Sequence, residues 1–257
     1  MLNIDKTDIV IIGGGITGTA IARELSKYEL NVVLLEKEPD IGTGSTKANS
    51  AILHAGFDAK PGSRKAALNV RGNQLYHDWE DELGLDIKWT GSLVVAVNDE
   101  ESETLKELLE RGRTNGVPGL KLLSRAEVLA KEPNITQNVT SALWAPSAGI
   151  CLPFGAALAF AENAVNNGVT IVTDCPVEEI KVEDGKIKGV RTKYGFLAAK
   201  YVINAGGVHA DEISRLAGDD SFTIKPRKGE YVLFDKKVSS LVNNVLFPTP
   251  NKVSKGI

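Results

Sequence analysis

The stretch that decides the fold is residues 8–36, DIVIIGGGITGTAIARELSKYELNVVLLE. It begins with DIVIIG (8–13), an apolar, β-branched run that is typical of a buried parallel strand. Apolar positions at helical spacing follow over residues 16–28, and NVVLLE (31–36) indicates a second buried strand. A strand, a glycine turn, a helix and a strand in this order make a βαβ unit with a right-handed crossover. We therefore expect an α/β fold.

Three glycines of this unit, Gly13, Gly15 and Gly18, have the G-x-G-x-x-G spacing. The first permits a tight turn, the second lets the backbone approach a pyrophosphate, and the third, with Ala22, lets the helix pack closely on the strand. The helix N-terminus then attracts the phosphates. Glu36, eighteen residues beyond Gly18, is placed to accept hydrogen bonds from ribose hydroxyls. The pattern predicts a dinucleotide site, and the Glu36 carboxylate disfavours NADP, which leaves FAD and NAD open.

The composition excludes several other classes of protein. The 257 residues are 42% hydrophobic and 25% charged, an ordinary globular balance. A net charge of −3 leaves no basic excess for nucleic acid or an anionic membrane. We expect no transmembrane segment and no leader peptide, and hence a cytoplasmic protein. Cys151 and Cys175 lack the paired spacings of metal sites, so no metal is expected.

The rest of the chain changes character twice. After a loop rich in Gly and Ser at 41–64, the pattern to residue 149 predicts helices and alternating strands, among them 89–97. Buried-strand composition returns beyond residue 170, and RKGEYVLFD (227–235) alternates as a further strand. We predict two interleaved domains: a Rossmann-like dinucleotide-binding domain over 1–75 plus 150–217, and an α+β substrate domain over 76–149 plus 218–257.

A resemblance to a known family decides between FAD and NAD. Residues 45–56, STKANSAILHAG, continue as FDAKPGSRKAA and have the pattern N-S-x-x-x-H-x-G followed by P-G-S-x-K-A. This stretch resembles the flavin-proximal loop of the D-amino-acid-oxidase-like FAD enzymes, in the branch of FAD-dependent glycerol-3-phosphate dehydrogenases and L-2-hydroxyglutarate oxidases. VINAGG (202–207) resembles the second flavin signature of that family. The resemblance implies that the first domain binds FAD.

The cofactor-binding residues follow partly from the glycine motif and partly from the resemblance. Small residues after the strand near 202 let the backbone approach a cofactor without a clash. Val177 matches the family strand whose backbone contacts the adenine. The expected cofactor-binding residues are Gly13, Gly15, Ile16, Thr17, Gly18, Glu36, Lys37, Ser45, Thr46, Asn49, Ser50, Val177, Ala205, Gly206 and Gly207.

The resemblance also implies a small anionic 2-hydroxy compound as substrate, glycerol 3-phosphate first, L-2-hydroxyglutarate second and an amine third. Its oxidation releases a hydride, which the flavin accepts, and a hydroxyl proton, which the imidazole of His54 is suited to accept.

Residues 226–234 resemble the strand on the substrate side of the flavin. Arg227 or Lys228 would therefore pair with the substrate anion, and Tyr231 would hydrogen-bond near the reacting carbon. His77 and His209 are expected to be structural. The electron acceptor is not defined by the sequence.

The family continues beyond the position of Ile257 with another strand and a segment that closes over the flavin ring, so the sequence predicts a truncated chain. We therefore expect this polypeptide alone to bind FAD weakly or not at all and to turn over negligibly. A hypothesis of another class is that the chain is a nucleotide-binding module and no enzyme by itself. Bound flavin that substrate bleaches would favour the enzyme, and flavin that never bleaches would favour the module.

Overall fold

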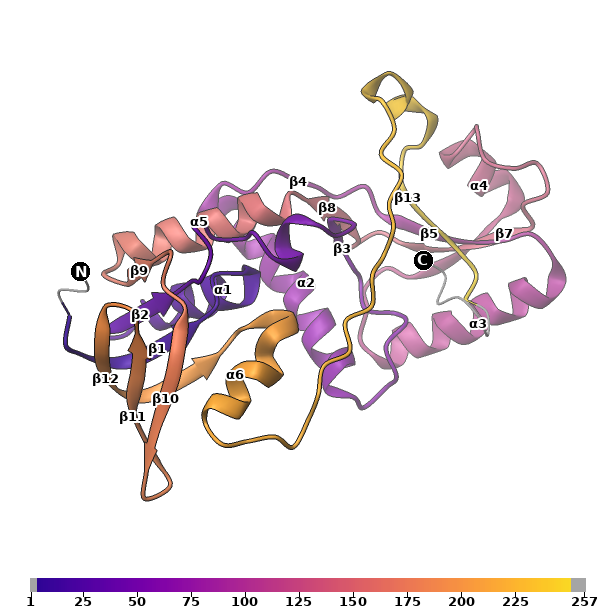
Figure 1. Cartoon of the computed structure of the whole chain (residues 1–257). Coiled ribbons are helices and arrows are strands. Elements are labelled where there is room, and N and C mark those ends of the chain that lie inside the picture. The colour runs from indigo at the N-terminus through magenta and orange to yellow at the C-terminus, as the bar shows by residue number, and fades with distance from the viewer. Residues whose placement is uncertain (1–3, 251–257) are drawn as a thin grey trace. The chain divides into compact units, whose positions relative to one another are not determined.

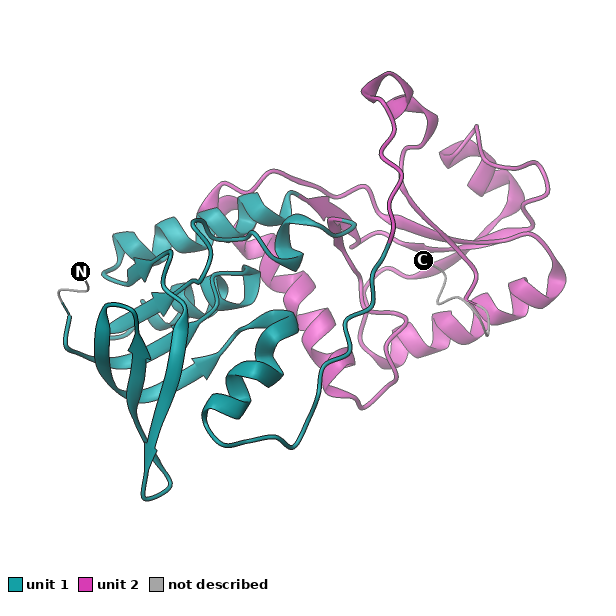
Figure 2. Cartoon of the chain, in the orientation of Figure 1, with its two compact units in different colours: residues 1–50, 152–229 teal, residues 51–151, 230–257 magenta. Residues whose placement is uncertain are grey.

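The computed structural model describes residues 4–250, which form two compact units (Figures 1 and 2). Residues 1–50 and 152–229 make the first unit, and residues 51–151 and 230–257 make the second. The sequence predicts the first division near residue 75 and the last near residue 217. The first division lies earlier because helix α2 (Arg64–Leu83) buries Val70 in the core of the second unit.

The first unit is built on a parallel sheet in the strand order β12-β1-β2-β9. Its strands are β1 (Lys6–Ile12), β2 (Val32–Leu35), β9 (Thr170–Val172) and β12 (Gly195–Asn204). Strands β10 (Val177–Glu183) and β11 (Lys186–Thr192) extend the sheet in antiparallel fashion. Strand β12 belongs to both parts, because residues 195–198 pair with β11 and residues 198–204 pair with β1.

Alternation along β1 distributes apolar side chains to both faces of this sheet. Ile9 and Ile11 pack under helices α1 (Ile16–Leu25) and α5 (Pro153–Asn166). Val10 and Ile12 pack on the other face, against β10, β11 and helix α6 (Ala210–Leu216). Both faces are covered, which explains why β2 and residues 9–12 of β1 are continuously apolar.

The turn after β1 is packed backbone to backbone. Gly13 has a φ of +111°, and a Cβ atom there would lie 2.4 Å from the carbonyl oxygen of Ala205, just after β12. A Cβ atom on Gly18 would lie 1.9 Å from the carbonyl oxygen of Gly13. The first and third glycines of the motif are therefore required by the fold itself.

The described elements of the second unit, besides α2, are β3 (Ile52–Leu53), β4 (Ile87–Lys88), β5 (Ser92–Ala96), α3 (Asp99–Thr114), β6 (Lys121–Ser124), α4 (Arg125–Lys131), β7 (Ser141–Ala145), β8 (Gly149–Cys151) and β13 (Val245–Pro248). They form a four-stranded sheet in the order β13-β5-β7-β6 and a small sheet in the order β3-β8-β4. Helix α3 packs Leu105 and Leu108 against Val94 and Leu143 of the larger sheet. Three short 3-10 helices, η1 (Ser45–Lys47), η2 (Gly207–His209) and η3 (Lys236–Leu241), complete the described chain.

The prediction of a strand at 227–235 is wrong. No strand among residues 4–250 pairs with this segment, which runs irregularly to η3. Its apolar side chains are exposed, and Leu233 has 97% of its surface accessible. The alternating pattern gives a strand two different faces, but a strand also needs a neighbouring edge that accepts its backbone hydrogen bonds.

None of the helices described within residues 4–250 is both long enough and apolar enough to cross a lipid bilayer.

The glycine packing gives a pair of opposite predictions. Gly18→Ala should lower the free energy of unfolding by about 2 kcal/mol or more, since the backbone oxygen of Gly13 cannot move aside. Gly72→Ala, inside α2 with no atom near the added methyl, should raise it by about 0.5–1 kcal/mol. Urea denaturation measures both, and equal stability of the two variants would contradict the packing argument.

A second prediction concerns Asp8, whose pKa falls to about 2 because Lys200 and the backbone of Asn31 hydrogen-bond to its carboxylate. A carboxylate whose pKa is lowered by folding stabilises the fold at pH values above its pKa in the unfolded chain, near 4. This contribution disappears as the pH falls through the pKa of the folded state, about 2. Wild-type protein should therefore be more stable than Asp8→Asn at pH 6, with the difference shrinking between pH 4 and pH 2. Denaturation at a series of pH values measures it, and a constant difference would contradict the assignment.

Candidate cofactor site

A cavity of about 760 Å³ lies in the first unit, where β1, β2 and β12 end. In open α/β sheets, ligands bind at the carboxyl ends of the strands. The lining of this cavity comes from the glycine turn, the segment after β2, the loop at 43–49, residues 175–177 and the chain from Ala205 into α6. Every lining residue belongs to the first unit.

One end of the cavity is suited to phosphate. Gly15, Ile16 and Thr17, which begin α1, line it, so that the positive end of the helix dipole faces the cavity. The amide of Ile16 donates to Oγ1 of Thr46 at 3.0 Å. The loop residue Thr46 is thereby fixed against the helix N-terminus, and its hydroxyl keeps a proton that a phosphate oxygen can accept.

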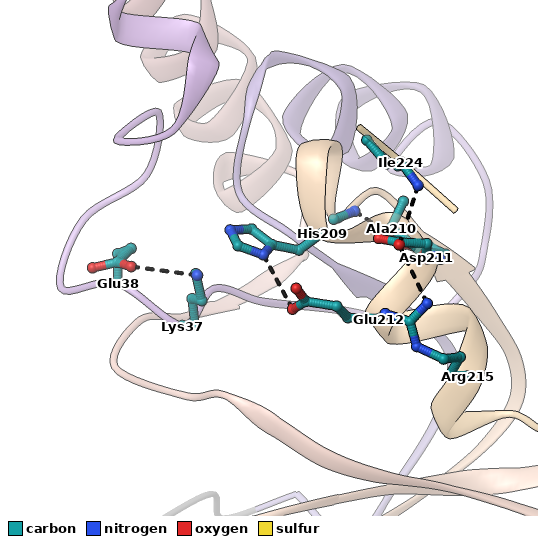
Figure 3. A network of polar contacts seen from close by, with 10 residues as sticks. Lys37, Glu38, His209, Ala210, Asp211, Glu212, Arg215 and Ile224 are labelled. Carbon is teal, nitrogen blue, oxygen red and sulfur yellow. Dashed lines mark hydrogen bonds and ion pairs between the residues drawn. The ribbon is translucent and has the colours of Figure 1, made fainter. Parts of the chain in front are cut away.

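Glu36 lies next to this end, just after β2, and is buried. Its Oε2 accepts a hydrogen bond from the amide of Gly14 at 2.6 Å, and its Oε1 accepts one from the amide of Glu38 at 2.9 Å. The neighbouring cation, Lys37, pairs with Glu38 at 3.7 Å (Figure 3). Two backbone donors thus orient the Glu36 carboxylate, which lines the cavity as an acceptor for hydroxyls.

A further wall of the cavity is formed by the turn at 205–207 and by α6. The side-chain amide of Asn204 donates to the carbonyl of Ala210 at 2.7 Å. Asp211 accepts from the amide of Ile224 at 3.1 Å (Figure 3). These contacts hold α6 to the end of β12 and to the chain that follows. His209 and Glu212 face the cavity from this wall.

The structure brings most of the predicted cofactor-binding residues together. The predicted residues that line the cavity are Gly13, Gly15, Ile16, Thr17, Glu36, Lys37, Ser45, Thr46, Asn49, Val177, Ala205, Gly206 and Gly207. Gly18 does not line it and acts through its packing on Gly13, and Ser50 lies exposed at the end of the loop.

Sequence reasoning missed the part of the wall that α6 and the residue before it contribute: His209, Glu212, Ile213 and Leu216. These four residues carry no motif. The spacing of polar and apolar positions in the helix after the second small-residue turn was the available signal.

The predicted catalytic residues are divided between the units. His54 follows β3 in the second unit, and its ring stacks on Phe247 with 5.8 Å between centroids. Partial burial, and then the charge of Lys65, lower the pKa of His54, which favours the neutral imidazole that a base requires.

Tyr231 also belongs to the second unit, whereas Arg227 and Lys228 belong to the first; all three lie in the irregular segment. Their convergence with His54 stays a prediction.

A glycine turn, a helix N-terminus and an acidic residue after the second strand, all facing one cavity, define a dinucleotide-binding protein. The residues fit FAD, since the phosphate end and the acceptor for ribose hydroxyls are both formed. The model of the FAD dependent oxidoreductase (DAO) family matches residues 8–256, and the chain belongs to this family. FAD, and not NAD, is therefore the cofactor, as the resemblance implied.

Individual proteins show the same relationship. A glycerol 3-phosphate dehydrogenase of Caloramator mitchellensis is 46% identical over 250 residues, which cover 97% of this chain and 52% of the relative. The mitochondrial L-2-hydroxyglutarate dehydrogenase of Homo sapiens is 34% identical over 258 residues, which cover 95% and 55%. The solved structure of dithionite-reduced L-α-glycerophosphate oxidase from Mycoplasma pneumoniae, with FAD bound, has a TM-score of 0.83 at 30% identity, over 96% of this chain and 66% of that one. The chain thus spans about half the length of these two relatives.

The geometry of Glu36 predicts its contribution to binding. Glu36→Gln keeps the shape of the side chain but replaces a charged acceptor, so the affinity for ADP should fall about tenfold. Isothermal titration calorimetry measures this change. Glu183→Gln, at the exposed end of β10, is the matched control and should bind as wild type. Unchanged affinity of the Glu36 variant would count against a ribose contact.

Proposed function

We propose that the protein is an FAD-dependent oxidoreductase that oxidises a small anionic 2-hydroxy compound, with glycerol 3-phosphate as its substrate. The observation that carries this proposal is the 46% identity to a glycerol 3-phosphate dehydrogenase over 97% of the chain. The cavity of the first unit supports it, because the cavity offers a phosphate end and a ribose end to a dinucleotide.

Each unit has its own task in this proposal. The first turn of α1 and the hydroxyl of Thr46 hold the pyrophosphate, and Glu36 orients the adenosine ribose. FAD, when bound, supplies an acceptor for the hydride. His54 accepts the hydroxyl proton of the substrate, Arg227 or Lys228 neutralises the substrate anion, and Tyr231 hydrogen-bonds near the reacting carbon.

L-2-hydroxyglutarate is the second candidate substrate. It is favoured by the 34% identity to a dehydrogenase of that compound and by the loop around His54, whose pattern is closer to that branch. Both compounds are anionic and carry the hydroxyl on the carbon to be oxidised, so the same base and a local cation serve either one. In this proposal the protein acts in the cytoplasm and passes its electrons to a separate acceptor.

The substrate assignment predicts which compound reduces the flavin. The purified protein, reconstituted with FAD under anaerobic conditions, is mixed with glycerol 3-phosphate, L-2-hydroxyglutarate or glycine, and the visible absorbance of the flavin is followed. We expect glycerol 3-phosphate to bleach it fastest of the three, at a low rate in this polypeptide alone, for which the sequence predicts negligible turnover. Faster bleaching by L-2-hydroxyglutarate would favour the second candidate, and bound flavin that none of the three bleaches would favour a nucleotide-binding module.

The role of His54 predicts a specific kinetic defect. His54→Gln should lower kcat by about 10²- to 10⁴-fold with an unchanged flavin content, because only proton transfer is lost. Since the pKa of His54 is lowered, the activity that depends on this base should persist somewhat below pH 6.5 and fall only at lower pH. The pH profile of the variant should lack this fall on the acidic side. His77→Gln, whose ring stacks on Trp89, is the control. Equal kcat values for His54→Gln and wild type would remove His54 from the mechanism.

A further inference from the structure

Helix α6 and the residue before it present one face to the cavity. His209, Glu212, Ile213 and Leu216 are spaced three, four and seven positions apart, which places them on one side of the helix, and all four line the cavity. Ile213 and Leu216 pack on the apolar core beneath the sheet. His209 and Glu212 therefore form the polar rim above an apolar floor.

The two rim residues contact each other. Nδ1 of His209 lies 3.1 Å from Oε2 of Glu212, and the side chains keep 45% and 62% of their surface accessible. A pair this exposed contributes little to stability, so its main effect is to orient the imidazole. Among residues 4–250, Nε2 has no hydrogen-bond partner. Figure 3 shows the ring pointing toward the side of Lys37 and Glu38.

The charges at this rim indicate which part of a dinucleotide lies there. Glu212 lies at this rim beside His209, and Glu38, which is paired with Lys37, lies on the side toward which the ring points (Figure 3). Lys47, the other lysine that lines the cavity, belongs to the loop at 43–49. This excess of negative charge disfavours a phosphate, which the start of α1 attracts instead. A neutral, planar group suits the rim, and the adenine base is the neutral, planar group of the ADP half.

We propose that His209, oriented by Glu212, binds the cofactor by covering the adenine ring with the face of its imidazole. This inference rests on the proposed function in which the cavity holds FAD. The sequence predicts a structural role for His209, but its exposure and its place on the cavity wall fit a binding role. Bases stack on aromatic side chains without regard to hydrogen-bond pattern, so the contact requires a flat ring more than a particular nitrogen atom.

The test separates the base from the phosphates. The 257-residue chain is titrated calorimetrically with ADP and with inorganic pyrophosphate, as wild type, His209→Ala and His209→Phe. His209→Ala should bind ADP about fivefold or more weakly and pyrophosphate unchanged, and His209→Phe should bind ADP within about twofold of wild type. Lys106→Ala breaks a similar exposed pair, with Glu103, in the second unit and should bind both ligands as wild type.

Two results would overturn the inference: an equal loss of ADP and pyrophosphate binding in His209→Ala, which would place the imidazole on the phosphates, or a His209→Phe variant as weak as His209→Ala. Normal ADP binding by His209→Ala would do the same. Wild-type protein that binds no ADP would overturn the proposed cofactor site itself, and this result differs from a failure of the histidine contact alone. Thermal unfolding of each variant verifies that the fold is intact.

Discussion

The close contact between the turn after β1 and the end of β12 is the constraint on which the first unit depends. Gly13 has no room for a side chain because of the carbonyl of Ala205, and Gly18 has none because of Gly13. This contact brings the first turn of α1 and the chain after β12 to the same edge of the sheet. The phosphate end of the cavity and its α6 wall are both consequences of it.

The acidic residue after β2 shows how the fold prepares a polar site before any ligand arrives. The Glu36 carboxylate is buried, and a buried charge is costly unless hydrogen bonds compensate it. The amides of Gly14 and Glu38 supply that compensation. One of these donors, the amide of Gly14, belongs to the glycine turn. The side chain of Glu36 therefore links the phosphate end of the cavity to its ribose end.

The sequence predicts a structural feature well when the residues that determine it lie close together in the chain. The βαβ unit and most of the cavity lining, including Glu36, follow from residues near one another in the chain, where strand patterns and glycine spacing have direct physical meaning. The strand at 227–235 was predicted wrongly because alternation describes faces and not the partner that must supply hydrogen bonds. The sequence does not predict His209 as a wall residue of the cavity, because its position depends on where α6 packs. A short sequence pattern does not contain that information.

The pairing of β1 with β12 also has a consequence for the order of events during synthesis. Lys6 pairs with Ala198 and Ile12 with Asn204, so the second unit's residues 51–151 leave the ribosome before the first unit can complete its sheet. At a translation rate of about 5–20 residues per second, β1 and β2 wait on the order of ten seconds or more for that partner. During this interval their apolar side chains, buried on both faces in the finished protein, are open to chaperones and to aggregation.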